Sequence, residues 1–326
     1  MPDGLLLVIG LLLLLGGGEA VVRGAAALAR RFGISDLAIG LLVVAFGTSA
    51  PELAVNSTAA FAGQTDLSFG NIVGSNMANV GLVVGVCGVI RWMQVDSVVI
   101  SREIPMMLLA TAAVIVMAAD PWIDGEPARF DRGDSIIMFL LFGVFLYYTV
   151  GELIRQRAAH PSLDDLISSD LPGAGPHVSL ARNLLVTVSG FGALLYGASI
   201  TVDSAVGLAR SFGVSDVVIG ISIVAIGTSL PELATGVIAT LRGHMEIAIG
   251  NVIGSNIFNL LFVLAVTAFI RPIDVPAWGM LDLAVAAALA LSLFVVSISG
   301  GRRILRAEAA VLVAVYLGYQ TWRIAF

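Results

Sequence analysis

The chain has 326 residues, of which 58% are hydrophobic and 12% are charged, and its mean hydropathy is +0.98. Soluble domains carry about 25% charged residues, so this composition excludes an ordinary soluble protein and indicates several membrane spans. The net charge is −6, which does not favour nucleic acid as a partner. Cys87 is the only cysteine, so no intrachain disulfide can form. The three histidines lie in polar connections, which leaves no His/Cys cluster for zinc.

Ten apolar segments are each long enough to cross the hydrocarbon core as a helix, which takes roughly 20 residues. The first resembles the apolar run of a signal peptide but lacks its basic start, so we interpret it as a membrane span. The ten segments lie near residues 4–30, 36–62, 68–90, 103–119, 134–153, 183–209, 216–241, 247–270, 279–299 and 307–323.

The sequence repeats itself at an offset of 180 positions without a gap. Gly40–Ala54 reads GLLVVAFGTSAPELA, and Gly220–Ala234 reads GISIVAIGTSLPELA. A second motif reads GNIVGSNMANV from Gly70 and GNVIGSNIFNL from Gly250. Duplication of a five-span unit explains the whole pattern. Since five is odd, consecutive copies must be inverted relative to each other, a construction that recurs in secondary transporters.

We therefore expect an all-α polytopic membrane protein with ten transmembrane helices in two inverted-topology five-helix repeats. Residues 1–153 would form the first repeat with spans 1–5, and residues 182–326 the second repeat with spans 6–10. Residues 154–181 are polar and contain prolines, so they read as a linker. If the N-terminus is outside, 12 of the 17 arginines fall on the inner side and 5 on the outer side. This asymmetry predicts both termini outside, a cytoplasmic linker, and insertion in the inner (plasma) membrane.

Each copy of the first motif places a carboxylate, Glu52 or Glu232, inside an apolar segment. A charged group at bilayer depth costs at least a few kcal/mol, so an intramembrane carboxylate is a functional-site hypothesis by default. The preceding proline, Pro51 or Pro231, removes a backbone donor and frees a carbonyl that lipid cannot satisfy. A bonded acid kept only for packing is the alternative, but duplication would hardly preserve it twice.

Hydroxyl and amide groups supply further oxygen atoms near the two carboxylates. In the first motif these are Thr48 and Ser49, with Thr228 and Ser229 in the second copy. The second motif places polar residues at every fourth position, which forms one stripe along a helix. The stripes are Asn71, Ser75 and Asn79 in the first half, and Asn251, Ser255 and Asn259 in the second.

The remaining polar residues of these segments favour a structural role. We interpret Asn71, Asn76, Asn251 and Asn256 as ties between broken helix ends and facing backbones rather than as ligands. Ser75 and Ser255 could also serve helix packing. Glu19 and Arg23 have the spacing of an ion pair. Asp203 could line an access path or lie at the surface.

All of the candidate donors to a cation are oxygens, and two of them are ionised. Hard cations such as calcium bind carboxylate, carbonyl, hydroxyl and amide oxygens. Two facing carboxylates balance one divalent charge, and when that ion leaves they repel each other and recruit sodium ions or protons. An enzyme is not expected, because no histidine lies in a span and Ser49 and Ser229 have only carboxylate neighbours. An ion channel is disfavoured, because a tight divalent cage favours occupancy over rapid release.

The paired GTSxPE and GNxxGSNxxN segments resemble the two alpha-repeats of the calcium/cation antiporter superfamily, specifically the prokaryotic sodium/calcium exchangers. The resemblance covers nearly the whole chain and implies exchange of sodium for calcium on a ten-helix inverted-repeat fold. It also implies particular ion ligands. These are the carbonyls of Ala45 and Ala225 together with Thr48, Ser49, Glu52, Ser75, Asn79, Thr228, Ser229, Glu232, Ser255 and Asn259.

One position departs from part of that family. Its potassium-dependent branch and some prokaryotic exchangers carry an aspartate where this chain has the neutral Asn259, which disfavours potassium co-transport. The leading hypothesis is a secondary active antiporter in which calcium and sodium compete for Glu52 and Glu232 by alternating access. The alternative is a proton/calcium or other divalent cation exchanger. No cofactor and no protein partner are expected, and calcium, sodium and the lipid bilayer are the predicted interactants.

Overall fold

A computed structural model describes residues 3–120, 125, 127–159, 180–212 and 225–325. Most of these residues are helical, as the composition predicts. Most of the predicted linker and residues 216–224 of the predicted seventh span lie outside the described residues.

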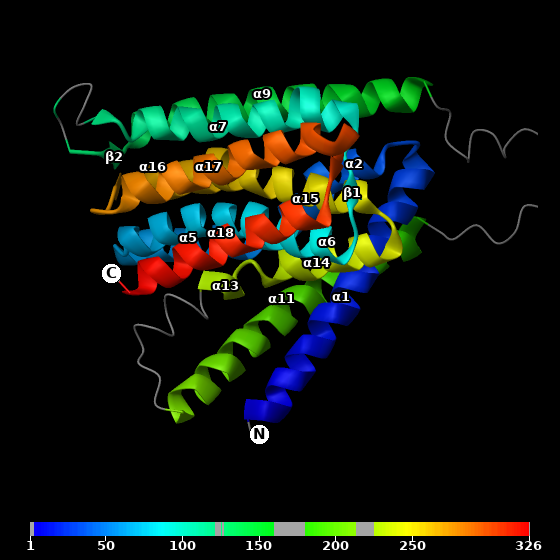
Figure 1. Ribbon diagram of the computed structural model, residues 1–326, viewed down its shortest axis with the longest axis horizontal. Helices are drawn as coiled ribbons and strands as arrows, with labels where there is room; N and C mark the ends of the chain where they lie inside the picture. Colours follow the sequence, from blue (N-terminus) through cyan, green and yellow to red (C-terminus); the bar gives the residue numbers. More distant parts are fainter. Residues whose placement is uncertain (1–2, 121–124, 126, 160–179, 213–224, 326) are drawn as a thin grey trace, which may run out of the picture.

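The helices of the first half occur in the order in which the apolar segments predict them (Figure 1). Several are interrupted by π-helical turns, which are labelled η. The elements are α1 (Asp3–Phe32), α2 (Asp36–Ile39), η1 (Gly40–Val44), α3 (Ala45–Thr48), α4 (Ala50–Ala62), α5 (Thr65–Ala78), η2 (Asn79–Val84), α6 (Gly85–Ile90), η3 (Val99–Glu103), α7 (Ile104–Met117) and α9 (Arg132–Ala159).

The second half repeats this order of helices, and one of its interruptions matches one of the first half. Its elements are α11 (Leu180–Ser211), α13 (Ala225–Gly227), α14 (Leu230–Arg242), α15 (Met245–Phe258), η5 (Asn259–Val263), α16 (Leu264–Ile270), α17 (Gly279–Ile298), the 3-10 turn η6 (Ser299–Gly301) and α18 (Arg306–Ala325). The π turns η2 and η5 begin at Asn79 and Asn259, which are equivalent in the sequence repeat.

Seven helices within the described ranges are long and apolar enough to cross a membrane. The pair Asp36–Thr48 and Ala50–Ala62, bent by 41°, passes the same test as one broken span and would make eight. The α18 helix has 20 residues but is not among the seven. The chain is therefore a multi-pass membrane protein, and the number ten remains a prediction.

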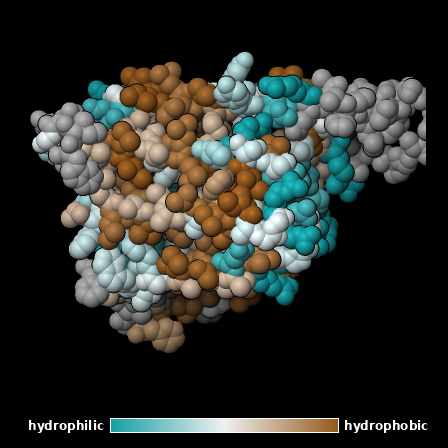
Figure 2. Space-filling view, turned by 45° about the horizontal axis from the view of Figure 1, so that its top comes forward, coloured by the Kyte–Doolittle hydropathy of each residue, from teal (hydrophilic) through white to brown (hydrophobic). Residues whose placement is uncertain are grey.

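Figure 2 supports this conclusion on one face of the molecule, where hydrophobic residues form a broad belt and hydrophilic residues gather toward one end. Exposed leucine, isoleucine, valine and aromatic side chains are spread over the outer helices, among them Leu140 and Tyr147 of α9. In water such a surface would aggregate. In a bilayer it faces lipid.

The α15 helix forms the centre of the bundle. Every residue from Ile247 to Phe258 is buried, which is the pattern of a helix surrounded by protein. A Cβ atom added at Gly250 would lie 2.6 Å from the carbonyl oxygen of Leu37, and one added at Gly40 would lie 2.8 Å from that of Ile247. Only glycine permits this approach, which packs a helix of the second half against a broken helix of the first.

The α1 and α11 helices lie side by side and cross the other helices obliquely (Figure 1). Their contact is made through glycines. A Cβ atom added at Gly10 would lie 3.0 Å from the carbonyl oxygen of Gly197, and one added at Gly17 would lie 2.8 Å from that of Gly190. Since the lower-numbered glycine of α1 meets the higher-numbered glycine of α11, the two helices are antiparallel.

Among the described residues, four two-residue strands form two antiparallel ladders, so the fold departs slightly from the all-α prediction. Strand β1 (Met93–Gln94) pairs with β4 (Arg303–Ile304). Strand β2 (Arg129–Phe130) pairs with β3 (Ile273–Asp274). Figure 1 places β1 and β2 near opposite ends of the bundle. Each ladder therefore joins two connections that emerge at the same end.

Candidate ion-binding site

The two predicted carboxylates are buried at the centre of the molecule. Glu52 lies in the first turn of α4 and Glu232 in the first turn of α14, and each side chain is 0% exposed. They are close enough to repel each other electrostatically. The positive end of each helix macrodipole partly offsets the cost of a buried negative charge at this position. Two like charges buried together nevertheless require a cation or protons.

A break in each helix places the carboxylate. Ser49 separates α3 from α4 with φ −88° and ψ 6°, and Ser229 repeats this geometry before α14 with φ −88° and ψ 5°. Pro51 and Pro231 then occupy the first turn of α4 and α14, where a missing amide donor costs no helical hydrogen bond. The proline therefore starts a new helix after the break, whereas the sequence suggested a proline inside one distorted helix.

One hydrogen bond joins the two halves directly at the carboxylates. The Ser49 hydroxyl donates to Oε1 of Glu232 at 3.2 Å. Ser75 lies beside Glu52, and Ser255 lies beside Glu232. Hydroxyl groups from the second motif of each half thus reach the carboxylates of the first motif.

Several buried oxygens of this site accept no hydrogen bond from any described residue. Such oxygens are rare in proteins, because leaving a buried polar atom unpaired costs about 1–3 kcal/mol. A cation bound among them would satisfy several at once. The unpaired site oxygens are both Oε atoms of Glu52, Oε2 of Glu232, Oγ of Ser229 and Ser255, and Oδ1 of Asn79 and Asn259.

The asparagines Asn79 and Asn259 occupy equivalent positions but differ in their contacts. Asn79 donates from Nδ2 to Oδ1 of Asn256 at 3.0 Å, which leaves its own Oδ1 unpaired. Neither amide atom of Asn259 has a partner among the described residues, and the residue is 0% exposed. Both begin π-helical turns, and such turns are frequent at functional sites.

The predicted carbonyl ligands lie one turn before the breaks. The carbonyl oxygen of Ala45 accepts the backbone amide of Ser49 at 3.0 Å and lies 3.4 Å from the Thr48 hydroxyl. Ala225 begins α13, and its backbone alone is described. Thr48 is buried, and Thr228 is partly exposed.

The asparagines interpreted as structural ties make two kinds of contact. Asn76 donates to the carbonyl oxygen of Asn256 at 3.3 Å, and Asn256 donates to that of Asn76 at 3.4 Å, which confirms the predicted contact with a facing backbone. Asn71 and Asn251 instead contact threonine hydroxyls of the opposite half.

Two residues of this network were missed by the sequence reasoning. Asn56 is one turn after Glu52 and donates to the Glu52 carbonyl oxygen at 2.7 Å. Thr235 is nearly one turn after Glu232 and donates to the carbonyl oxygens of Pro231 and Glu232 at 2.8 and 3.0 Å. Their spacing of three or four residues from a buried carboxylate was the available signal.

The acids outside the site have other partners. Glu19 forms the predicted ion pair with Arg23 and also binds Arg242 of α14, with an Nη2–Oε1 distance of 2.5 Å. Asp203 is exposed and accepts a hydrogen bond from Ser199 at 3.5 Å. The surface interpretation of Asp203 therefore fits better than a place in the site.

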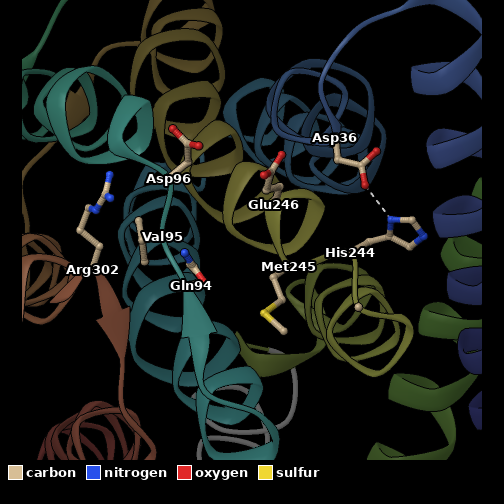
Figure 3. Close-up of a pocket in the computed structure, with 9 residues that line it drawn as sticks. Asp36, Gln94, Val95, Asp96, His244, Met245, Glu246 and Arg302 are labelled. Carbon is tan, nitrogen blue, oxygen red and sulfur yellow. Dashed lines mark hydrogen bonds and ion pairs between the residues drawn. The ribbon is translucent and has the colours of Figure 1, made fainter. Parts of the chain in front are cut away.

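A cavity of about 490 Å³ lies at the end of the bundle that carries β1 and β4, away from the buried carboxylates. Figure 3 shows Asp96, Glu246 and Asp36 around it, with Asp36 bonded to Nδ1 of His244 at 2.6 Å. None of the predicted site residues lines it. In the described part of the chain, no three His, Cys, Asp or Glu side chains are grouped to hold a metal ion, so a cation would depend on neutral oxygens as well as acids.

The fold and the site together define a multi-pass helical membrane protein with paired carboxylates in its interior, which is the arrangement of ion-transport proteins. The sequence profile of the family described as "Sodium/calcium exchanger protein" matches residues 4–151 and 182–325. The chain therefore belongs to the sodium/calcium exchanger family.

Individual relatives agree with this assignment. The sodium/calcium exchanger MaX1 of Methanosarcina acetivorans is 30% identical over a match that covers 97% of this chain and 96% of that protein. The inner membrane protein YrbG of Escherichia coli is 38% identical over 267 residues, 82% of this chain and 79% of its own length. A solved structure of the sodium-calcium exchanger NCX_Mj has a TM-score of 0.82 and 29% identity, with 99% of both chains covered.

Proposed function

We propose that this protein is a secondary active antiporter that exchanges sodium for calcium by alternating access. The observation that carries the proposal is the pair of fully buried carboxylates, Glu52 and Glu232, surrounded by unpaired oxygens from both halves. Family membership supports cation exchange. MaX1 and NCX_Mj are both described as sodium/calcium exchangers, which supports sodium and calcium as the exchanged ions. Transport requires no enzymatic chemistry and no cofactor.

Competition for the same two carboxylates provides the coupling. One calcium ion balances both negative charges, and hydroxyl, amide and carbonyl oxygens complete its coordination. When calcium leaves, the repulsion between Glu52 and Glu232 favours the binding of sodium ions. An empty, doubly charged site is costly inside a membrane, so the site changes the side it faces while occupied.

The proposal is tested by isotopic calcium flux in proteoliposomes, with sodium, potassium and proton gradients imposed separately. We expect uptake to follow an outward sodium gradient at clamped pH and to ignore a potassium gradient, because Asn259 is neutral. Uptake that ignores sodium but follows a pH gradient would establish the proton/calcium exchanger instead. Calcium flux that needs no counter-ion would identify a channel.

The proposed architecture has ten spans in two inverted repeats, with residues 1–153 and 182–326 as the repeats and 154–181 as the linker. The antiparallel contact of α1 with α11 supports the inversion, because Gly10 and Gly17 are equivalent to Gly190 and Gly197 at the offset of 180. The reciprocal contact of Asn76 with Asn256 has the same two-fold character. The two separate matches of the family profile agree with these boundaries.

We place both termini outside and the linker in the cytoplasm, in the inner (plasma) membrane. Arginine asymmetry supports this orientation. The β1–β4 ladder joins two connections predicted to be cytoplasmic, and the β2–β3 ladder joins two predicted to be external. The description of YrbG as an inner membrane protein supports the location.

Asn259→Asp is expected to strengthen cation binding. It adds a third carboxylate at a fully buried position whose amide has no described partner. A unit-charge attraction at 4 Å is worth about 4 kcal/mol at an effective dielectric constant of 20, and desolvation of the new charge offsets part of it. We expect the half-saturating calcium concentration to fall about tenfold in equilibrium binding. Asn183→Asp, a buried position on α11 outside the site, is the control, and equal effects in both variants would contradict the placement of Asn259.

A further inference from the structure

Two threonines of the site, Thr48 and Thr228, are each held by an asparagine of the opposite half. Thr48 lies 3.1 Å from Oδ1 of Asn251, and Nδ2 of Asn71 lies 3.1 Å from the Thr228 hydroxyl. The two pairs are equivalent at the offset of 180. Their hydrogen bonds nevertheless have opposite directions: Thr48 donates to Asn251, whereas Thr228 accepts from Asn71. In each case the direction is set by a backbone carbonyl, which can only accept.

The first chain of hydrogen bonds starts at Glu232. The Thr235 hydroxyl has one proton, which is committed to the carbonyl oxygens of Pro231 and Glu232 at 2.8 and 3.0 Å. Thr235 can therefore only accept from Asn251, whose Nδ2 lies 3.1 Å away. The carbonyl end of Asn251 must then face Thr48, which donates.

The other neighbours of Thr48 lead to the same conclusion. One of them, the carbonyl oxygen of Ala45 at 3.4 Å, is also an acceptor. A third neighbour is the Glu232 carboxylate, which also accepts. Thr48 is therefore the donor in each of these contacts. Both lone pairs of the Thr48 oxygen remain for a cation.

The second chain of hydrogen bonds starts at Glu52. Asn56 donates from Nδ2 to the Glu52 carbonyl oxygen at 2.7 Å, and the same nitrogen donates its other proton to Oδ1 of Asn71 at 2.8 Å. Asn71 must therefore present its Nδ2 to Thr228, which accepts. One lone pair of the Thr228 oxygen is consumed, and the Ser75 hydroxyl also lies 3.4 Å from it, so at most one lone pair remains for a cation.

The two chains of hydrogen bonds differ because the two sequence repeats have different residues at two positions. Thr235 stands where the first half has Val55, and Asn56 stands where the second half has Gly236. A side chain cannot be added at Gly236 without displacement, because its Cβ would lie 2.9 Å from Cγ1 of Val83. The second half therefore depends on Thr235 for the contact that Asn56 makes in the first.

We propose that Thr235 and Asn56 are positioning residues that orient Thr48 and Thr228 in opposite senses and so make the two sides of the ion site unequal for sodium. The Thr48 side offers a hydroxyl with two lone pairs, and the Thr228 side offers a hydroxyl with at most one. A cation bound beside Thr48 is held more tightly. This inference rests on the proposed sodium/calcium exchange at the site.

Thr235→Val tests the inference, because it keeps the shape of the side chain but removes the hydroxyl that accepts from the Asn251 amide. The Asn251 side chain can then turn over, and Thr48 no longer has a fixed direction of donation. We expect the half-saturating sodium concentration for calcium release to rise roughly three- to tenfold, with the maximal rate little changed. Thr235→Ser retains the hydroxyl and is expected to restore the original value.

A matched control is available on the same helix. Thr240 is also 0% exposed, and its hydroxyl lies beside the Cys87 thiol, outside both chains of hydrogen bonds. Thr240→Val makes the same chemical change without touching either chain of hydrogen bonds. We expect it to leave sodium dependence unchanged.

A double-mutant cycle with Thr48→Val separates positioning from simple packing. If Thr235 acts through the Thr48 hydroxyl, Thr235→Val adds nothing once that hydroxyl is gone. Additive effects, or unchanged sodium dependence in Thr235→Val, would overturn the inference. Should Thr235→Val fail to fold, Asn251→Leu removes the same acceptor from Thr48 and is expected to show the same non-additivity.

The two proposals fail in different ways. Full exchange in Glu52→Gln would overturn the proposed ion site itself. Loss of exchange in Glu52→Gln together with additive effects of Thr235→Val and Thr48→Val would overturn the positioning role alone.

Discussion

Glu52→Gln and Glu232→Gln are each expected to abolish calcium transport, with uptake reduced at least about a hundredfold. The variants leave one carboxylate in the site, which cannot balance a divalent ion. Each also places an amide donor where the ion would bind. Losing one partner of a buried charged pair costs about 3–5 kcal/mol, which corresponds to a factor of roughly 10² to 5 × 10³ in binding. Calcium uptake into proteoliposomes measures the loss.

The same variants are expected to remain folded, because the substitution removes a buried charge that is repelled by its neighbour. Calcium should raise the thermal unfolding temperature of the original protein, since a ligand that binds the folded state stabilises it. It should not raise that of either variant. Asp203→Asn is the control, because Asp203 is an exposed acid on α11, a helix that is also apolar enough to cross a membrane. Normal exchange by Glu52→Gln or Glu232→Gln would refute the site.

The sequence repeat is the reason that the carboxylates could be found without a structure. A single buried glutamate would have been ambiguous, but Glu52 and Glu232 occur in matching motifs at one offset. The structure brings them together at the starts of α4 and α14, which agrees with the proposed inversion of the two halves. The apolar segments likewise predicted most of the helices, because hydropathy alone decides which segments lipid tolerates.

What the repeat could not predict lies where its copies differ. At the repeat offset of 180, Val55 is equivalent to Thr235 and Asn56 is equivalent to Gly236, so neither position stood out as duplicated. Their roles depend on which carbonyl lies beside them after the helix breaks at Ser49 and Ser229. The direction of a hydrogen-bond chain is a property of the folded site, and periodicity contains no information about it.

The contact between α1 and α11 was also hidden in the sequence. Gly10 and Gly17 could have been interpreted as ordinary glycines of an apolar helix, because a small-residue motif does not identify the helix that packs against it. The structure shows that the partner is the equivalent helix of the other half, with backbones in near contact. The α1 helix also lies against α14, where a Cβ atom at Gly18 would be 3.3 Å from the carbonyl oxygen of Ala234. Support for α14 near Glu232 therefore depends on this packing.

Gly17→Leu is expected to prevent normal folding. A Cβ atom at Gly17 would lie 2.6 Å from the backbone nitrogen of Leu194 and 2.8 Å from the carbonyl oxygen of Gly190, and a leucine needs far more space than one carbon. Overpacking of a core costs about 1–3 kcal/mol when side chains can move, and here the obstacles are backbone atoms, so we expect a loss at or above that range. The measurements are monodispersity in detergent and the thermal unfolding temperature.

Gly16→Leu provides a matched control one residue away. Gly16 is exposed, and no heavy atom lies within 4 Å of its added Cβ. Leucine is also a better helix former than glycine by about 0.8–1.0 kcal/mol, so this variant should be as stable as the original protein or slightly more so. Equal unfolding temperatures for Gly16→Leu and Gly17→Leu would contradict the close packing of α1 on α11. A loss confined to Gly17→Leu would show that lipid accepts a side chain on one face of α1 where the partner helix excludes it on the other.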